Sequence, residues 1–337
     1  MYNEFFGLHS PPFRLTPDAN FLYLSKGHSK ALSFLRYGVY KEEGFIVVTG
    51  EVGTGKTTLI QSLVTSLNKN EVIAGKVVYS RLNADDLLRT VLASFNLRYD
   101  NLSKTGMLRT LEEFFQFNRR GNKRVLLIVD EAQNLTAEAL EELRMLSNLE
   151  LDGEPLLQTF LLGQPEFRRM MQAPEFRQLL QRVTAAYHLG PLEQEEVSDY
   201  VLYRLHIAGS SGKPTFAPGV SATLYRHTGG IPRRLNTLCD RVMLSAFLDH
   251  VDRIDSERVE TVANELETEL GGAIATDADT HRAVGENTLG LNGYDKQAVA
   301  PLDKEHLTPQ QQQGLSRLEQ TMDEMRRALR NLLGPGR

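Results

Sequence analysis

The sequence contains few cysteines and no long hydrophobic run. Its single cysteine among 337 residues, Cys239, excludes an internal disulfide and a cysteine-rich zinc site, as is typical of a reducing compartment. We expect Cys239 to be a buried helix residue. The longest apolar runs, FIVV and VLLIV, are far too short to cross a bilayer. The N-terminus lacks the apolar centre of a signal peptide, because Glu4, Pro11, Pro12 and Arg14 interrupt it.

An excess of positive charge is also missing. The formal net charge is -5, which gives no global attraction to nucleic acid or anionic lipid. The eight histidines show no metalloprotease spacing, and no G-x-S-x-G, zinc-finger or RRM signature is present. The densest basic cluster is expected to be a solvated loop before a strand: Arg119, Arg120, Lys123 and Arg124. We therefore expect a cytoplasmic protein, with any contact with the inner membrane peripheral.

Strand and helix signals alternate along the first part of the chain. The predicted strands are 45–49, 76–80, 125–130, 157–163 and 184–189, and the helices 56–68, 84–95, 105–118, 136–149 and 193–208. A further amphipathic helix before them is suggested by Leu32, Leu35, Tyr37 and Val39. The continuous apolar strands predict an α/β fold with a parallel sheet buried on both faces.

Beyond residue 192 the strand signals stop and four helical segments follow. The sequence thus predicts an α/β core at 1–191, a small all-helical domain at 192–270, a linker at 271–312 and a C-terminal amphipathic helix at 313–334. The last helix carries a heptad stripe of Leu315, Leu318, Met322, Met325, Leu329 and Leu332. Docking, oligomerisation and a marginal solvated helix remain alternatives for it.

The strongest motif follows the apolar run GFIVVT and has the form G-x-x-x-x-G-K-[ST]. Between a strand and a helix this pattern predicts a P-loop, whose backbone N–H groups surround the phosphates of a nucleotide. Lys56 would reach the β- and γ-phosphates of ATP, and the Thr57 hydroxyl would be a ligand of Mg²⁺. The residues expected to bind the nucleotide here are Gly50, Glu51, Val52, Gly53, Thr54, Gly55, Lys56, Thr57 and Thr58.

A second motif, RVLLIVDEAQ, places two acids at the end of a buried strand. Asp130 would hold the Mg²⁺ shell, and Glu131 would orient or deprotonate the attacking water. The strand at 76–80 separates this strand from the P-loop strand in sequence. P-loop ATPases of the additional-strand type share that separation, and in them an extra strand lies between the two in the sheet.

Several polar residues occupy positions where such ATPases sense the γ-phosphate. Gln164 ends a strand and could contact the attacking water, or simply cap the next helix. Arg177 and Arg182 precede the last strand, where an arginine can reach a neighbouring subunit's nucleotide, and position favours Arg182. Arg233 or Arg234 opens a helix of the second domain and could return to the γ-phosphate. Solvated surface groups remain the alternative for each arginine.

Together these residues resemble an AAA+ ATPase. The segments FFGLHSPPFRLTPDANFLYLSKGHSKALSFLRYGV, GFIVVTGEVGTGKTT, LNADDLLRTVL, LLIVDEAQNL, LLGQPEF and GGIPRRLN are similar to secretion ATPases of the general secretion pathway protein A and pilus ATPase group. Within that group the chain looks most like the ATPase of PEP-CTERM/exosortase exopolysaccharide loci. The resemblance covers residues 1 to about 270 and implies a P-loop AAA+ three-layer sandwich with a helical lid.

The resemblance also implies ATP and Mg²⁺ as cofactors, a homo-oligomer in ring or filament form, and envelope export or polysaccharide assembly proteins as partners. It assigns Gln164 as first sensor, Arg182 as the arginine acting in trans and Arg233 as second sensor, with adenine near residues 21–28. The membrane span and peptidoglycan-binding region of that group are not expected in this sequence. A DNA-associated switch of the transposition-helper type and a nucleotide-binding scaffold are the alternative functions.

Overall fold

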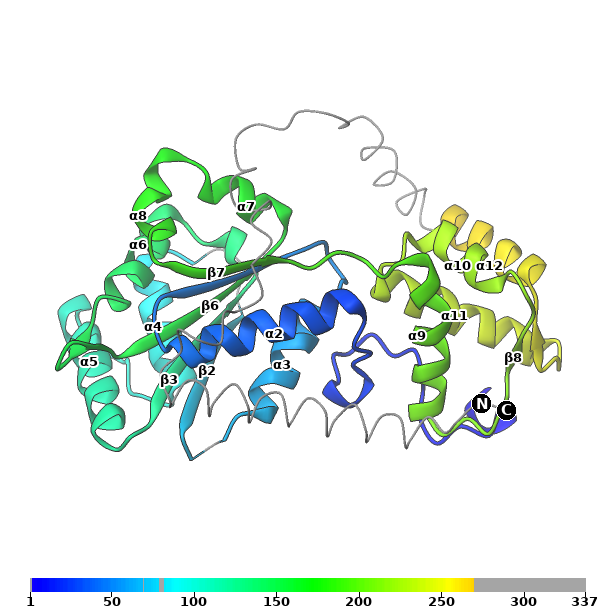
Figure 1. The fold of residues 1–337 in the computed structure, drawn as a ribbon, viewed down its shortest axis with the longest axis horizontal. Coiled ribbons are helices and arrows are strands. Elements are labelled where there is room, and N and C mark those ends of the chain that lie inside the picture. Colours follow the sequence, from blue (N-terminus) through cyan, green and yellow to red (C-terminus); the bar gives the residue numbers. More distant parts are fainter. Residues whose placement is uncertain (1, 69, 79–81, 270–337) are drawn as a thin grey trace, which may run out of the picture. The chain divides into compact units, whose positions relative to one another are not determined.

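The structure is a computed structural model that describes residues 2–68, 70–78 and 82–269 (Figure 1). The predicted linker at 271–312 and C-terminal helix at 313–334 lie outside these residues. Within the described part of the chain, no helix is long and apolar enough to cross a bilayer.

A five-stranded, all-parallel sheet forms the centre of the α/β part. Its strands lie in the order β2 (Val72–Val78), β3 (Arg124–Asp130), β6 (Leu157–Gly163), β1 (Phe45–Thr49) and β7 (Val183–His188). An extra strand does separate the P-loop strand β1 from the acidic strand β3, and that strand is β6. Strand β2, which intervenes between them in sequence, lies at the edge. The parallel α/β fold predicted from the sequence is confirmed.

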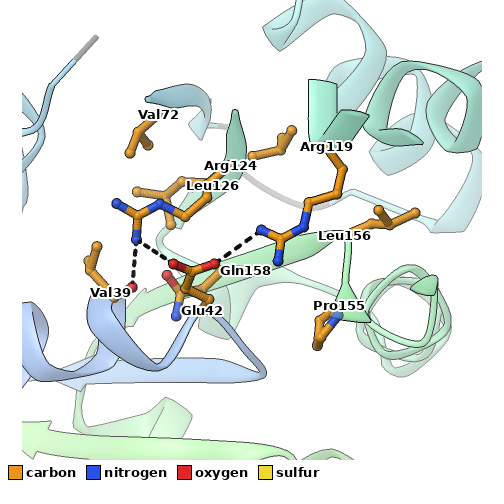
Figure 2. Close-up of a pocket in the computed structure, with 10 residues that line it drawn as sticks. Val39, Glu42, Val72, Arg119, Arg124, Leu126, Pro155, Leu156 and Gln158 are labelled. Atoms are coloured by element: carbon orange, nitrogen blue, oxygen red, sulfur yellow. Dashed lines mark hydrogen bonds and ion pairs between the residues drawn. The ribbon is translucent and has the colours of Figure 1, made fainter. Parts of the chain in front are cut away.

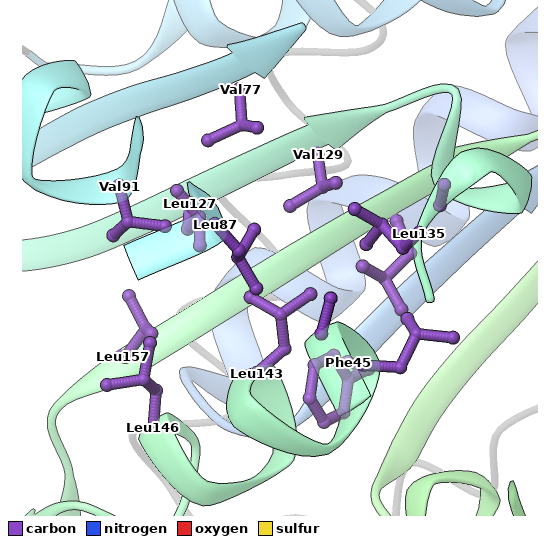
Figure 3. Close-up of a cluster of buried hydrophobic side chains, with 14 of the residues drawn as sticks. Phe45, Val77, Leu87, Val91, Leu127, Val129, Leu135, Leu143, Leu146 and Leu157 are labelled. Carbon is purple, nitrogen blue, oxygen red and sulfur yellow. The ribbon is translucent and has the colours of Figure 1, made fainter. Parts of the chain in front are cut away.

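Alternate residues of the central strands point to opposite faces of the sheet. An apolar core covers each of the two faces. Phe45, Val47, Leu127 and Val129 belong to one apolar core, part of which Figure 3 shows. The other face of β1, β3 and β6 contributes to a second core: Ile46, Val48, Leu126, Ile128, Phe160 and Leu162. Two layers of helices cover these faces, giving a three-layer sandwich.

The helices of the first core are α4 (Ala84–Ser94), α5 (Lys104–Arg120), α6 (Ala137–Leu146), α7 (Pro165–Met171) and α8 (Arg177–Leu180). Those of the second core are α2 (Lys26–Lys41) and α3 (Lys56–Ser66). Short elements complete this part: the 3-10 turns Ala19–Phe21, Ala132–Asn134 and Pro174–Phe176, and a hairpin of β4 (Glu150–Leu151) and β5 (Glu154–Pro155).

Helix α2 begins after Ser25, whose hydroxyl accepts a hydrogen bond from the backbone N–H of His28, as an N-cap residue does. Its buried face carries Leu35 and Val39, as the apolar spacing predicts. Tyr37 was expected on the same face but is 52% exposed. The α-helical period explains the difference, because a residue two positions from Leu35 lies about 200° around the helix.

A helical unit follows the sheet. It consists of α9 (Gln194–Ile207), α10 (Val220–Thr228), α11 (Pro232–Leu248) and α12 (Ser256–Glu269). The unit is not purely helical, because β8 (Thr215–Phe216) and β9 (Arg253–Ile254) form a short parallel ladder. Cys239 lies on the buried face of α11, as expected, and burial raises the pKa of its thiol to about 12. We call residues 192–269 the lid.

The N-terminal segment packs into the core of the lid. Phe6, Leu8 and Phe13, together with Phe21, are buried among the apolar residues of α9 to α12. The short helix α1 (Tyr2–Phe5) joins this contact, since the Tyr2 hydroxyl donates to Asp240 of α11. By packing, residues 2–13 therefore lie with the lid, although the sequence grouped them with the α/β core.

The expected basic loop is an ion-pair cluster at the edge of the sheet where the parallel strands begin. Arg119, in the last turn of α5, and Arg124, at the start of β3, both pair with Glu42 (Figure 2). Arg119 also pairs with Glu154. The Arg124 guanidinium also donates to the carbonyl of Val39, over 3.0 Å. The expectation of a solvated loop was therefore wrong for these two arginines, because the end of α2 supplies an acceptor that is distant in sequence.

Candidate functional site

The expected P-loop and the acidic pair meet at the opposite edge of the sheet, where the strands end. In a parallel sheet all carboxyl ends point the same way, and ligands bind in the crevice beyond them. Thr49 ends β1, Asp130 ends β3 and Gly163 ends β6, with β6 between the other two. The topology thus brings the loop after β1, Glu131 and Gln164 to one place.

The P-loop connects β1 to α3 through two glycines with left-handed backbone angles. Gly53 has φ +87° and Gly55 has φ +97°, and Gly55 is the residue before the first turn of α3. Lys56 is buried, and its ammonium donates to the carbonyls of Gly50 and Glu51, over 2.7 and 2.9 Å. Burial lowers the pKa of Lys56, while the nearby carboxylates of Glu131 and Asp130 act in the opposite direction.

The predicted metal ligands are in contact. The Thr57 hydroxyl donates to Oδ2 of Asp130 over 2.9 Å, and the Lys76 ammonium lies 3.7 Å from the same oxygen. Asp130 is buried at the end of β3. A hydroxyl oxygen and a carboxylate are ligands that suit Mg²⁺, which is held by one or two carboxylates together with phosphates and water. These residues therefore fit the expected cation.

Glu131 lies beside this pair and is held by two glutamine amides. The amide nitrogen of Gln133 donates to Oε2 of Glu131 over 2.6 Å, and that of Gln164 donates to the same oxygen over 3.1 Å. Gln164 precedes α7 and was the expected first sensor. Gln133 was not among the expected site residues, although the DEAQ motif contains it.

A cleft of about 970 Å³, counted with its part open to solvent, extends from the P-loop to the N-terminal segment and the lid. Its P-loop side includes Gly53, Gly55, Lys56, Thr57 and Thr58, with Glu131 beyond them. Its other side is formed by Phe21, Leu22, Tyr23, His28, Tyr200, Arg204 and Asn236, among others. The region expected to receive adenine thus lines the same cleft as the P-loop.

Arg233 joins the lid to the P-loop. It lies in the first turn of α11, and its backbone N–H donates to the carbonyl of Gly53 over 3.1 Å. A Cβ atom at Gly53 would lie 2.4 Å from the Cβ of Arg233, so only glycine permits this approach. Arg233 also lines the cleft, whereas Arg234, the alternative, does not line it.

The arginines expected to act in trans are not at this site. Phe45, at the start of β1, donates its backbone N–H to the carbonyl of Arg182, so Arg182 lies where the strands begin. The length of β1 separates it from the P-loop by roughly 15 Å, at about 3.3 Å per residue. Its guanidinium donates to the carbonyl of Ser147 over 3.1 Å, whereas Arg177, which begins α8, is exposed.

His28 supports the P-loop in a way that the sequence did not indicate. Its Nε2 lies 3.0 Å from the carbonyl of Thr54, and its Nδ1 lies 2.7 Å from the Ser25 hydroxyl. A neutral ring with hydrogen on Nε2 donates to Thr54 and accepts from Ser25. Burial lowers the pKa of His28, which favours that neutral form.

The geometry agrees with comparisons to known proteins. Residues 39–171 match the family model described as an AAA domain. General secretion pathway protein A of Aeromonas hydrophila is 44% identical over 248 residues, which are 73% of this chain and 45% of that protein. The chain is thus homologous to that protein but spans less than half of its length.

Solved structures show the same fold. The ORC2 protein of Aeropyrum pernix has a TM-score of 0.59 at 17% identity, over 75% of this chain and 71% of that one. Cdc6p of Pyrobaculum aerophilum has a TM-score of 0.59 at 19% identity, over 74% and 71%. At such low identities the similarity shows the fold alone. The enzyme class is shown by the match to the family model. Residues 39–171 are an AAA domain, and the chain is an ATPase of the P-loop AAA type.

Proposed function

We propose that this chain hydrolyses ATP with Mg²⁺ and that the reaction supports the assembly or operation of an envelope export system. The observation that carries the hydrolytic role is the position of Glu131, held by two amides beside the Thr57–Asp130 pair. In this proposal Lys56 binds the phosphates, while Thr57 and Asp130 hold Mg²⁺, which would neutralise charge on the phosphate oxygens. Glu131 takes a proton from the attacking water, and Gln164 and Arg233 contact the γ-phosphate.

The export role rests on homology to a protein named for the general secretion pathway. The finer proposal is an exopolysaccharide system of the PEP-CTERM/exosortase kind, with the chain at the inner membrane through peripheral contact. The DNA-associated alternative has weaker support, because the similar structures, among them Drosophila ORC bound to DNA and Cdc6p, are only 14% to 19% identical and share the fold alone. The net charge of -5 likewise provides no general attraction to DNA.

Replacing Thr57 by Ala tests both parts of the proposal. The change removes a proposed Mg²⁺ ligand, so we expect turnover of Mg-ATP to fall at least about 100-fold, as when one group that stabilises a transition state is lost. In source cells whose only copy carries the change, export of the polymer should stop. Thr65→Ala is the matched control, because Thr65 is an exposed threonine of the same helix whose hydroxyl donates to the carbonyl of Gln61.

Turnover and export, measured separately, distinguish the proposed ATPase activity from the proposed export role. Normal turnover by the Thr57→Ala protein would contradict the metal site. Lost turnover with normal export would contradict the export role and leave the ATPase intact. Retention of wild-type protein on duplex DNA that depends on ATP and weakens with salt, in cells with normal export, would favour the DNA-associated alternative.

We also propose that the chain forms a homo-oligomer in which an arginine before β7 reaches the neighbouring site. Arg182→Ala and Arg177→Ala should each be compared with Arg109→Ala, a surface control on α5 that pairs with Glu113. The variant that lacks the acting arginine should lose about 100-fold in turnover. Mixing it with the Glu131→Gln protein, which keeps both arginines, should restore turnover above the sum of the two. Additive activity in every mixture would contradict action in trans.

A further inference from the structure

Gln133 makes a bridge between the predicted base and the neighbouring strand. Its amide nitrogen donates to Oε2 of Glu131 over 2.6 Å. Its amide oxygen accepts from the backbone N–H of Gln164 over 3.1 Å. Both ends of one side chain are therefore used, one on the carboxylate at the end of β3 and the other on the backbone at the end of β6.

The local backbone explains why Gln133 can reach Glu131. Glu131 has φ +55° and ψ +42°, a left-handed conformation that is uncommon for a residue with a side chain. Two hydrogen bonds maintain it: the N–H of Glu131 donates to Oδ1 of Asp130, and the N–H of Asn134 donates to the carbonyl of Glu131. The resulting tight turn brings the side chain two residues later back over the carboxylate.

The two donors act on a single oxygen of Glu131. Gln133 and Gln164 both bond to Oε2, and among the described residues no donor contacts Oε1. A carboxylate that is fixed through one oxygen keeps its orientation and presents the other oxygen to a water molecule. Such positioning matters because a displacement of about 1 Å at a reacting group can cost about 100-fold in rate.

We propose that Gln133 is a positioning residue, which fixes the rotamer of Glu131 so that Oε1 faces the attacking water. The inference rests on the proposed hydrolytic role of Glu131. Only a carboxamide of this length fits both contacts, because one end must donate to a carboxylate and the other must accept from an N–H. A glutamate in this place would set two carboxylates against each other, and an asparagine would be one methylene too short.

Gln133→Met tests this proposal, since methionine keeps the length of the side chain and removes both hydrogen bonds. We expect kcat for ATP to fall about 10- to 100-fold, while KM and the affinity for ATP stay within about twofold, as when an interaction of the transition state alone is lost. Gln133→Glu should lower kcat at least as much. Gln116→Met is the matched control, because Gln116 donates to Glu112 over 3.1 Å on α5, away from the site.

The outcomes separate this inference from the proposed function. If Glu131→Gln is inactive while Gln133→Met turns over like the wild type, the positioning role is wrong and the hydrolytic role stands. If Gln133→Met raises KM at unchanged kcat, Gln133 only supports the loop, which also overturns the proposal. Normal turnover by Glu131→Gln would remove the proposed function itself. In single-turnover hydrolysis, adding Gln133→Met to Glu131→Gln should change little, because both act through one carboxylate.

Discussion

Replacing Lys56 by Ala should abolish ATP turnover and weaken ATP binding strongly. The Lys56 ammonium lies within the P-loop, where it would exchange the carbonyls of Gly50 and Glu51 for phosphate oxygens. A hydrogen bond to a charged group contributes about 1.5–3 kcal/mol, and each 1.4 kcal/mol is a factor of ten in affinity. Loss of contacts to two phosphates therefore predicts binding that is weaker by roughly 10²- to 10⁴-fold.

The measurement is titration calorimetry with a non-hydrolysable ATP analogue, together with steady-state turnover. Lys104→Ala is a suitable control, because Lys104 is a surface lysine of α5 that pairs with Glu142. Circular dichroism should show that the Lys56→Ala protein is folded. Binding of the analogue at wild-type affinity by that folded protein would show that the loop does not hold the phosphates.

Replacing Glu131 by Gln should stop hydrolysis while ATP stays bound. An amide cannot accept the proton of the attacking water, and general base catalysis contributes about 10²- to 10⁴-fold. The amide can still turn its oxygen towards the donors of Gln133 and Gln164. The turn after β3 and the contacts of the P-loop should therefore persist, so affinity for ATP should change by less than about threefold.

Quench-flow hydrolysis and nucleotide binding measure these two effects separately. Glu138→Gln is the control, because Glu138 is an exposed acid in the first turn of α6. Turnover by Glu131→Gln near the wild-type rate would assign the base to another residue. If the assembled wild-type protein itself shows no turnover, the chain is a nucleotide-binding scaffold, which was the third hypothesis.

Local patterns predicted the strands and the loop well, because both depend on residues close together in the sequence. β1 and β6 have the predicted bounds of 45–49 and 157–163. For β1 the reason is an apolar run that lies between two glycines, Gly44 and Gly50. The motif around Lys56 likewise predicted the strand, turn and helix that surround it. β2 begins four residues before its prediction at 76, since Val72 to Gly75 lack a strong alternating pattern.

Tertiary placement was harder to predict, because it depends on residues far apart in the sequence. Nothing around Phe6 or Phe13 indicates that they pack against α9 to α12 instead of the sheet. A hydrophobic residue is expected to be buried, but its type does not show which residues it packs against. For the same reason the pairing of Arg124 with Glu42 was missed, although both residues were visible as charges.

The role of Gln133 was missed for a different reason. A glutamine two residues after a strand end is compatible with many turns, and it becomes informative only with the left-handed backbone of Glu131. A left-handed backbone is usually predicted from a glycine, and this position holds a glutamate, so the sequence did not predict the turn. The placement of Gln164 was predictable from the end of β6, but the oxygen that it contacts was not.

The packing of residues 2–13 into the lid gives the chain two connections between lid and sheet. One runs through residues 14–25 into α2, and the other runs from β7 through residues 189–193 into α9. The first is fastened to the second, because the backbone N–H of Lys26 donates to Glu196 over 2.7 Å. The lid is therefore tied to the sheet by two segments of the chain that are hydrogen-bonded to each other, and not by a single linker.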